Sequence, residues 1–337
     1  MYEEFCRGAE RMTLLRTVGR LLAICVLGVS LAPVHAAQAD IGDPVIAAAG
    51  DIACDPSNPS FNGGNGTATK CHMQATSTIL QNLLTTTNLQ KILPLGDEQY
   101  ACGALQAFNE SYGPTWGQPA LQAITSPVPG DHEYITASGT RGGLDCPLTP
   151  GSGYYSYFGS AAGDPSQGYY SYDLGAWHII ALNSVCRNIG GCGRTSPEYN
   201  FLQADLAAHP TTCTLAYWHH PRFASSTSGG SKSVAKFWDL LYSAGAEIVL
   251  NGHHHFYERF APQTPNQQPS PTGIQEFVVG TGGQNHATFG PVQPNSVVRD
   301  DSAFGVLTLT LHATSYDWQF VPEAGKTFSD SGSANCH

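Results

Sequence analysis

The chain has 337 residues, 41% of them hydrophobic and 12% charged, which suits one large globular domain, alone or with extensions. Its 15 Lys and Arg residues against 26 Asp and Glu residues give a net charge of −11. This charge excludes a general nucleic-acid binder, which needs a basic face to neutralise phosphates. An acidic protein can still bind phosphate where metal ions supply the positive charge.

The first 39 residues are typical of an export signal. Arg16 and Arg20 precede an apolar run over residues 21–31, and a small-residue cleavage site follows it. The run is shorter than the roughly 20 residues that a membrane-spanning helix needs. We therefore expect a secreted or cell-envelope protein without stable membrane association, and a single domain over residues 40–337.

Eight of the ten cysteines follow the expected signal, and an even number in an exported chain predicts disulfide bonds. The chain contains no Cys-x-x-Cys pair, which disfavours a zinc ribbon. The sequence leaves many pairings open. As a working expectation we take pairing between neighbours: Cys54–Cys71, Cys102–Cys146, Cys186–Cys192 and Cys213–Cys336.

From residue 45 onward, apolar runs alternate with helical and loop segments. The pattern predicts strands over residues 45–50, 92–95, 124–128, 169–174, 177–183, 214–218, 247–250, 275–280, 305–312 and 315–321. It predicts helices over residues 72–86, 197–208 and 233–244. This order of elements predicts an α/β protein with two packed β-sheets flanked by helices. Long Gly/Pro/Ser-rich loops, expected as substrate rims, cover residues 55–70, 136–168, 185–196, 224–232 and 261–273.

Five short segments place Asp or His directly after a predicted strand. They are Gly50-Asp51, Gly96-Asp97-Glu98-Gln99-Tyr100, Gly130-Asp131-His132-Glu133, His219-His220-Pro221 and Gly252-His253-His254-His255. Each segment alone also fits a turn Asp or a buried structural His, but the five together favour a shared site. Carboxylates and imidazoles at several strand ends predict a two-metal hydrolytic centre. Such ligands fit Fe, Mn, Zn, Mg or Ca rather than copper(I) or an iron–sulfur cluster.

The glycine before Asp51 and the one before Asp97 let the chain turn sharply, so that each carboxylate leaves the end of the sheet. His253 and His255 are two residues apart. In an extended chain both imidazoles would point to the same side, while His254 would point away and would not bind a metal.

The ordered motifs resemble those of the calcineurin-like metallophosphoesterases over about residues 43–320. In that family the first motif is often Asp-x-His, whereas this chain has Asp51-Ile52-Ala53. The purple acid phosphatase-like branch also lacks this histidine and has a Tyr three residues after the second Asp, as Tyr100 follows Asp97 here. The chain therefore resembles that branch, which implies a four-layer α/β/β/α sandwich of two mixed sheets.

The resemblance implies two metal ions. By position, the first ion would be held by Asp51, Asp97, Tyr100 and His255, and the second by Asp97, Asp131, His219 and His253, with Asp97 bridging. A tyrosinate implies Fe(III) at the first site, with a violet charge-transfer colour, and the resemblance implies a divalent ion (Fe, Zn or Mn) at the second. His132 matches the histidine that contacts phosphate and protonates the leaving oxygen.

The chain departs from this family at Asp131, where the motif has Asn. An added carboxylate lowers the positive charge of the metal pair, so we expect weaker anion binding or a preference for Mn, Ca or Mg at the second site. His220, Arg222 and His286 are candidate substrate contacts, and Arg222 fits a structural ion pair equally well. Glu133 and Glu258 are expected either to accept the outer N–H groups of the histidine ligands or to serve as framework groups.

The resemblance implies a secreted binuclear phosphatase that hydrolyses small phosphate monoesters by attack of a metal-bound hydroxide. A phosphodiesterase or nucleotidase of the same fold is the alternative within this class. A catalytically impaired metal-binding protein is the alternative from another class, and Asp131 is the feature that motivates it. A serine hydrolase is disfavoured because no Gly-x-Ser-x-Gly elbow is present.

Overall fold

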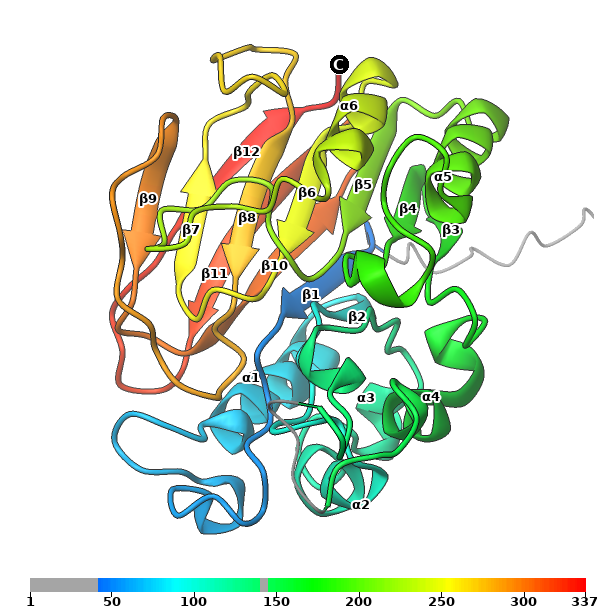
Figure 1. The fold of residues 1–337 in the computed structure, drawn as a ribbon. Helices are drawn as coiled ribbons and strands as arrows, with labels where there is room; N and C mark the ends of the chain where they lie inside the picture. Colours follow the sequence, from blue (N-terminus) through cyan, green and yellow to red (C-terminus); the bar gives the residue numbers. More distant parts are fainter. Residues whose placement is uncertain (1–41, 140–144) are drawn as a thin grey trace, which may run out of the picture. The chain divides into compact units, whose positions relative to one another are not determined.

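The computed structural model describes residues 42–139 and 145–337, which form two β-sheets and their surrounding helices (Figure 1). The export signal expected over residues 1–39 lies outside the described residues. Within the described ranges, no helix is both long enough and apolar enough to cross a membrane.

The smaller sheet has five strands in the order β12-β11-β10-β1-β2. β1 pairs parallel with β2 and antiparallel with β10, and the remaining pairs are antiparallel. The strands are β1 (Val45–Ala49), β2 (Leu89–Pro94), β10 (Gly305–Leu311), β11 (Ser315–Pro322) and β12 (Ser331–Asn335).

The larger sheet has seven strands in the order β3-β4-β5-β6-β8-β7-β9. β4, β5, β6 and β8 are parallel neighbours, whereas β3, β7 and β9 run antiparallel to their neighbours. The strands are β3 (Tyr170–Leu174), β4 (Trp177–Ala181), β5 (Cys213–Tyr217), β6 (Ile248–Asn251), β7 (Tyr257–Phe260), β8 (Gln275–Val279) and β9 (Ser296–Asp300).

Side chains of the larger sheet alternate between two apolar clusters, as the period of a strand requires. In β5, Leu215 and Tyr217 face the cluster shared with the smaller sheet, while Ala216 faces the opposite cluster. That opposite cluster includes Leu202 and Trp238 from two covering helices. The helices are α1 (Met73–Thr86), α2 (Leu105–Ala107), α3 (Pro119–Gln122), α4 (Ser152–Phe158), α5 (Pro197–Ala208) and α6 (Ala235–Ser243).

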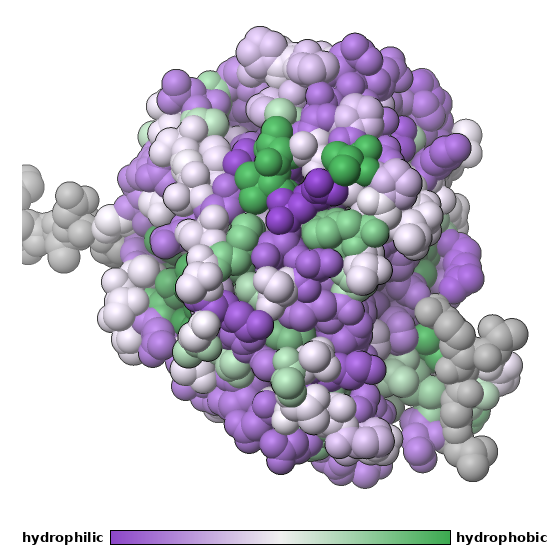
Figure 2. Space-filling model, turned by 90° about the vertical axis from the view of Figure 1, so that its left-hand side faces the viewer, coloured by the Kyte–Doolittle hydropathy of each residue, from purple (hydrophilic) through white to green (hydrophobic). Residues whose placement is uncertain are grey.

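Helices α5 and α6 cover the larger sheet, and α1 packs against β10 of the smaller one (Figure 1). This arrangement confirms the predicted α/β sandwich of two mixed sheets flanked by helices. The face on the β9 side is largely hydrophilic, with only small separate apolar patches (Figure 2).

The predicted helices over residues 72–86, 197–208 and 233–244 form, with ends within two residues of the prediction. The strand predicted over residues 124–128 is wrong, since this segment makes only single bridges, Ile92 with Thr125 and Leu95 with Val128. Prolines 127 and 129 lack the N–H group that a ladder needs. The sequence prediction also missed strands β7, β9 and β12 and helix α4.

Four disulfide bonds form, and the neighbour pairing is confirmed: Cys54–Cys71, Cys102–Cys146, Cys186–Cys192 and Cys213–Cys336. The third closes a short loop after β4, and the fourth ties β5 to the C-terminal tail. Both fix segments that leave the larger sheet.

His178 of β4 joins β3 to α5. Its Nδ1 lies 2.7 Å from Asp173 Oδ1 and its Nε2 lies 2.8 Å from Asp205 Oδ2. His209 completes a group with metal-ligand residue types, but its ring stacks on that of His178 at 13°. Two nearly parallel imidazoles cannot both direct an in-plane lone pair at one ion. The group therefore fits a protonated His178 between two carboxylates.

This ion pair predicts a pH-dependent stability. Burial alone would lower the pKa of His178, but the hydrogen bonds that it donates to Asp205 and Asp173 raise it above the usual value. A raised histidine pKa stabilises the fold at low pH, and this stability is lost as the pH rises through the folded-state pKa. H178Q should therefore cost about 1–3 kcal/mol in urea unfolding at about pH 5.5 and clearly less at about pH 9.

The matched control is H312Q. His312 also contacts two carboxylates, of Asp43 and Asp317, but all three side chains are substantially exposed. Exposed pairs contribute little, so H312Q should change the unfolding free energy far less. An H178Q cost that is equal at both pH values would contradict the assignment.

Candidate metal centre

The candidate centre lies where strands of both sheets end. Asp51 and Asp97 follow β1 and β2 of the smaller sheet, and His219 and His253 follow β5 and β6 of the larger one. Asp51, Asp97 and His253 adopt left-handed backbone angles, with φ of 59°, 52° and 71°. Aspartate, asparagine and histidine enter this region more readily than other non-glycine residues. The chain thus turns sharply at each strand end.

Gly96 allows the sheets to approach at this point. A Cβ atom there would lie 2.6 Å from Nδ1 of His219, and the residue has a φ of +83°. Any side chain would therefore both clash and strain the backbone. The glycine of the second motif thus brings Asp97 and His219 together.

The first cluster is centred on the Tyr100 hydroxyl. It lies 2.9 Å from Asp51 Oδ1, 3.0 Å from Asp97 Oδ2 and 3.0 Å from His255 Nε2. A hydroxyl donates one hydrogen bond, so it can satisfy only one of the two carboxylates, and His255 Nε2 also lies 3.0 Å from Asp51 Oδ1. A cation among these four side chains would account for the crowding, and the residues therefore fit a bound metal ion.

The second cluster is centred on Asp131. Its Oδ1 lies 3.4 Å from His219 Nε2, 3.4 Å from His253 Nδ1 and 3.7 Å from His220 Nε2. The facing nitrogens of His219 and His253 are 3.2 Å apart. This set of one carboxylate and three imidazoles has the ligand chemistry of a divalent transition metal.

Asp97 belongs to both clusters. The same Oδ2 atom that contacts Tyr100 lies 3.3 Å from His219 Nε2. Its other oxygen, Oδ1, accepts a hydrogen bond from the backbone N–H of His132 at 2.9 Å. This placement suits the bridging role that the sequence predicts for Asp97.

Backbone and amide oxygens orient the imidazoles. The Nδ1–H of His219 donates to the Leu95 carbonyl at 2.8 Å, and Nδ1 of His255 lies 3.1 Å from Asn285 Oδ1. In each case the other nitrogen, Nε2, faces the cluster. Such outer hydrogen bonds fix the tautomer and the ring orientation of a metal-binding histidine.

Of the two roles expected for Glu133 and Glu258, the structure shows the framework role and not the acceptance of these histidine N–H groups. Glu133 instead accepts backbone N–H groups of Asp97, Gln99 and Gly130 at 2.8–3.1 Å. It thereby holds the second and third motifs against each other. Burial raises the pKa of Glu133 to about 7, and the nearby Asp97 charge adds to this shift.

Glu258 accepts hydrogen bonds from Ser225 N and Ser296 Oγ, away from the histidine rings.

The extended backbone that the sequence analysis assumed for His253 and His255 is wrong. The segment after β6 is not extended, because His253 has a left-handed φ. Both imidazoles nevertheless face the clusters, and His254 turns away to contact the Gly229 carbonyl.

Charges within the centre act on one another. Burial alone would raise the pKa of Asp97 and of Asp51, but facing histidines, first His219 and His255 respectively, lower both below the usual value. Burial and the charges of Asp51 and Asp97 raise the pKa of Tyr100 well above its usual value. The phenol therefore stays protonated unless a strongly acidic cation binds it.

Of the four candidate substrate contacts, two lie at the clusters. His132 and His220 lie at the clusters: Nε2 of His132 is 4.0 Å from Asp97 Oδ2, and Nδ1 of His220 is 2.8 Å from Ser184 Oγ. His220 also lines a hollow of about 270 Å³ beside Asp131.

The side chains of Arg222 and His286 lie outside the two clusters. The Arg222 guanidinium sits over the Phe223 ring and lines a separate cavity with Lys236. The ring of His286 stacks on Phe304 at 3.9 Å. Aromatic packing thus places both side chains, and the sequence motifs gave no sign of it.

The sequence prediction missed Arg187, which lines the hollow beside Asp131 and His220. It follows Cys186 in a loop that the sequence marked as a substrate rim. An exposed cation inside a short disulfide loop was the available signal.

The bridging carboxylate can be tested by metal content. The native protein should hold two metal ions per chain after dialysis, and D97N should lose at least one because Asp97 contacts both clusters. Y100F should abolish any visible band from tyrosinate bound to iron(III). Elemental analysis and absorption spectra measure both. The control D164N changes an exposed carboxylate; equal metal content in D97N and D164N would contradict the centre.

No protein-family model matches the chain. Over 198 residues it is 28% identical to purple acid phosphatase 15 of Arabidopsis thaliana, covering 55% of this chain and 35% of that protein. Over 261 residues it is 25% identical to probable inactive purple acid phosphatase 1 of the same plant, covering 68% and 41%. The chain thus spans less than half the length of these curated relatives.

Among solved structures, the purple acid phosphatase PPD1 from yellow lupin (Lupinus luteus) seeds aligns with a TM-score of 0.69 at 19% identity. The alignment covers 87% of this chain and 54% of that one, and it shows a shared fold. Sequence and fold together identify the chain as a relative of the purple acid phosphatases, within the calcineurin-like metallophosphoesterases.

Proposed function

We propose that the chain is a secreted, binuclear metal-dependent phosphatase that hydrolyses phosphate monoesters. The observation that carries this proposal is the Tyr100 hydroxyl, which lies 2.9–3.0 Å from two carboxylate oxygens and one imidazole nitrogen and can donate one hydrogen bond. The purple acid phosphatase relatives support the reaction class. The disulfide bonds support an oxidising, extracellular location.

Asp51, Asp97, Tyr100 and His255 would hold one ion. Asp97, Asp131, His219 and His253 would hold the other. Two bound ions would lower the pKa of a water molecule, polarise the phosphoryl oxygens and neutralise the charge that develops on them. The phenol supports Fe(III) at the first site, and the imidazole-rich second cluster supports a divalent ion.

The contacts of His132 support a role as the general acid for the leaving group. Its Nδ1–H donates to the Ala101 carbonyl at 2.5 Å, so Nε2 is the atom that faces the clusters. A protonated Nε2 can transfer its proton to the ester oxygen as the bond to phosphorus breaks. The ring is partly exposed, with 22% of the side chain accessible, so it can also reach substrate.

A second candidate function is metal binding without turnover. Asp131 favours it because a third carboxylate beside Asp51 and Asp97 would weaken phosphate binding, and two relatives are named probable inactive purple acid phosphatases. The hydrolysis of a monoester by the native protein separates the two candidates.

The phosphatase assignment predicts the behaviour of H132N. Native protein should hydrolyse p-nitrophenyl phosphate faster than bis(p-nitrophenyl) phosphate, and chelation should abolish the activity. H132N should lower kcat by about 10²–10⁴-fold, the range for loss of a general acid, with metal content unchanged. The control is H209Q, an exposed histidine outside the centre. Activity that survives chelation would overturn the assignment.

D131N tests the effect of the additional carboxylate. Removing one negative charge beside the clusters should tighten inhibition by inorganic phosphate by about tenfold, because close charges interact strongly at partly buried positions. Inhibition constants and kcat for both proteins measure this. A large rise in kcat would favour the impaired metal-binding protein, whereas good native activity without such a rise would reject it.

A further inference from the structure

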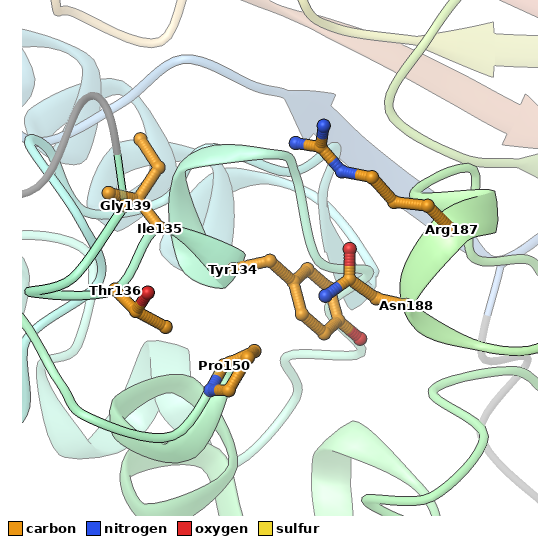
Figure 3. Close-up of a pocket in the computed structure, with 7 residues that line it drawn as sticks. All are labelled: Tyr134, Ile135, Thr136, Gly139, Pro150, Arg187 and Asn188. Atoms are coloured by element: carbon orange, nitrogen blue, oxygen red, sulfur yellow. The ribbon is translucent and has the colours of Figure 1, made fainter.

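A second cavity adjoins the hollow beside the candidate metal centre. The hollow, about 270 Å³, is lined by Asp131, His220 and Arg187 among others. The second cavity, about 390 Å³, is lined by Tyr134, Ile135, Thr136, Gly139, Pro150, Arg187 and Asn188 (Figure 3). Arg187 is common to both. A molecule whose phosphate lies at the clusters can therefore extend past Arg187 into the second cavity.

The second cavity has a fixed apolar wall. The Tyr134 hydroxyl lies 2.9 Å from the Tyr155 hydroxyl and accepts from Asn183 Nδ2 at 2.8 Å, which fixes its ring. Ile135 and Pro150 add further apolar surface. Such a wall suits the carbon skeleton of an ester rather than a second metal or a free inorganic anion.

Arg187 brings an exposed positive charge to both cavities. Within residues 42–139 and 145–337 its guanidinium makes no hydrogen bond and no ion pair. Its backbone is held in the short turn η5 (Cys186–Asn188), which the Cys186–Cys192 disulfide closes. Arg187 and Asn188 both project from this turn toward the cavity (Figure 3). The backbone of Arg187 is thus held in place, while its guanidinium group is available to a ligand.

We propose that Arg187 binds a second anionic group on the substrate, whose carbon skeleton lies against Tyr134 and Pro150. The preferred substrates are then phosphate monoesters whose alcohol carries a carboxylate or another phosphate. A planar guanidinium forms paired hydrogen bonds with either group. This inference rests on the proposed phosphatase function, since the metal centre would hold the scissile phosphate.

The test compares phenyl phosphate, 3-carboxyphenyl phosphate and 1,3-phenylene bisphosphate. Native protein should show kcat/KM about tenfold or more higher for the two doubly anionic esters, mainly through KM, as expected for charge-assisted hydrogen bonds. R187Q should remove this preference and leave phenyl phosphate within about twofold. R187K should retain part of it as a point charge. The comparison of 3-carboxyphenyl phosphate with 1,3-phenylene bisphosphate shows whether the preferred second anion is a carboxylate or a phosphate.

The matched control is R194Q, an exposed arginine of the same loop that lines a different cavity, with Arg222. R194Q should keep the preference. The proposal is overturned if R187Q keeps it too, or if R187Q slows phenyl phosphate as much as the other esters.

A binding experiment separates failure of this proposal from failure of the phosphatase function. If native protein hydrolyses none of the three esters, calorimetry with phenylphosphonate and 3-carboxyphenylphosphonate still measures the preference. Tighter binding of the carboxylated compound that R187Q abolishes supports the Arg187 site. Equal binding of the two compounds overturns it.

Discussion

The structure of the candidate centre depends on one constraint, the contact of Tyr100 with Asp51, Asp97 and His255 around a single hydroxyl. Buried acceptors this close repel one another unless a positive charge lies between them. The surrounding chain is built to enforce the contact. Glu133 ties the second and third motifs together through backbone N–H groups, and burial of the whole group excludes the water that would otherwise relieve the crowding. A bound cation would replace this repulsion by attraction and would thereby stabilise the folded protein.

Because the ligands come from both sheets, the centre exists only when the sheets pack. The carboxylates follow β1 and β2, whereas the histidines follow β5 and β6. Between the sheets lies the apolar cluster that holds Leu215 and Tyr217 on one side and β10 on the other. The position of Asp97 relative to His219 is therefore set by core packing, and Gly96 provides the clearance that this distance requires. A substitution in that core can change the spacing of the clusters without touching a ligand.

The sequence predicted the fold class, the strands before four of the five motifs and the convergence of the motif residues. These features follow from local patterns: apolar runs, strand-end glycines and the order of the motifs. It failed where tertiary contacts decide. The side chains of Arg222 and His286 pack on aromatic rings, and Glu133 accepts backbone N–H groups. Residues 124–128 form only single bridges, because Pro127 and Pro129 lack the N–H group that a ladder needs. His253 reached its position through a left-handed turn rather than the extended chain assumed. The ligand roles themselves stay predictions that metal analysis must decide.

Asp131 and Arg187 line the same hollow and carry opposite charges. In the proposed centre Asp131 would weaken the attraction of the two metal ions for phosphate, and Arg187 would supply a positive charge between the hollow and the second cavity. A substrate with a single phosphate experiences mainly the loss, whereas one with a second anion also gains the contact with the guanidinium. Together the two residues would lower the affinity for phosphate esters in general and raise the selectivity among them, since specificity is a difference between affinities. Aspartate in place of asparagine at position 131 would then affect substrate selectivity without abolishing turnover.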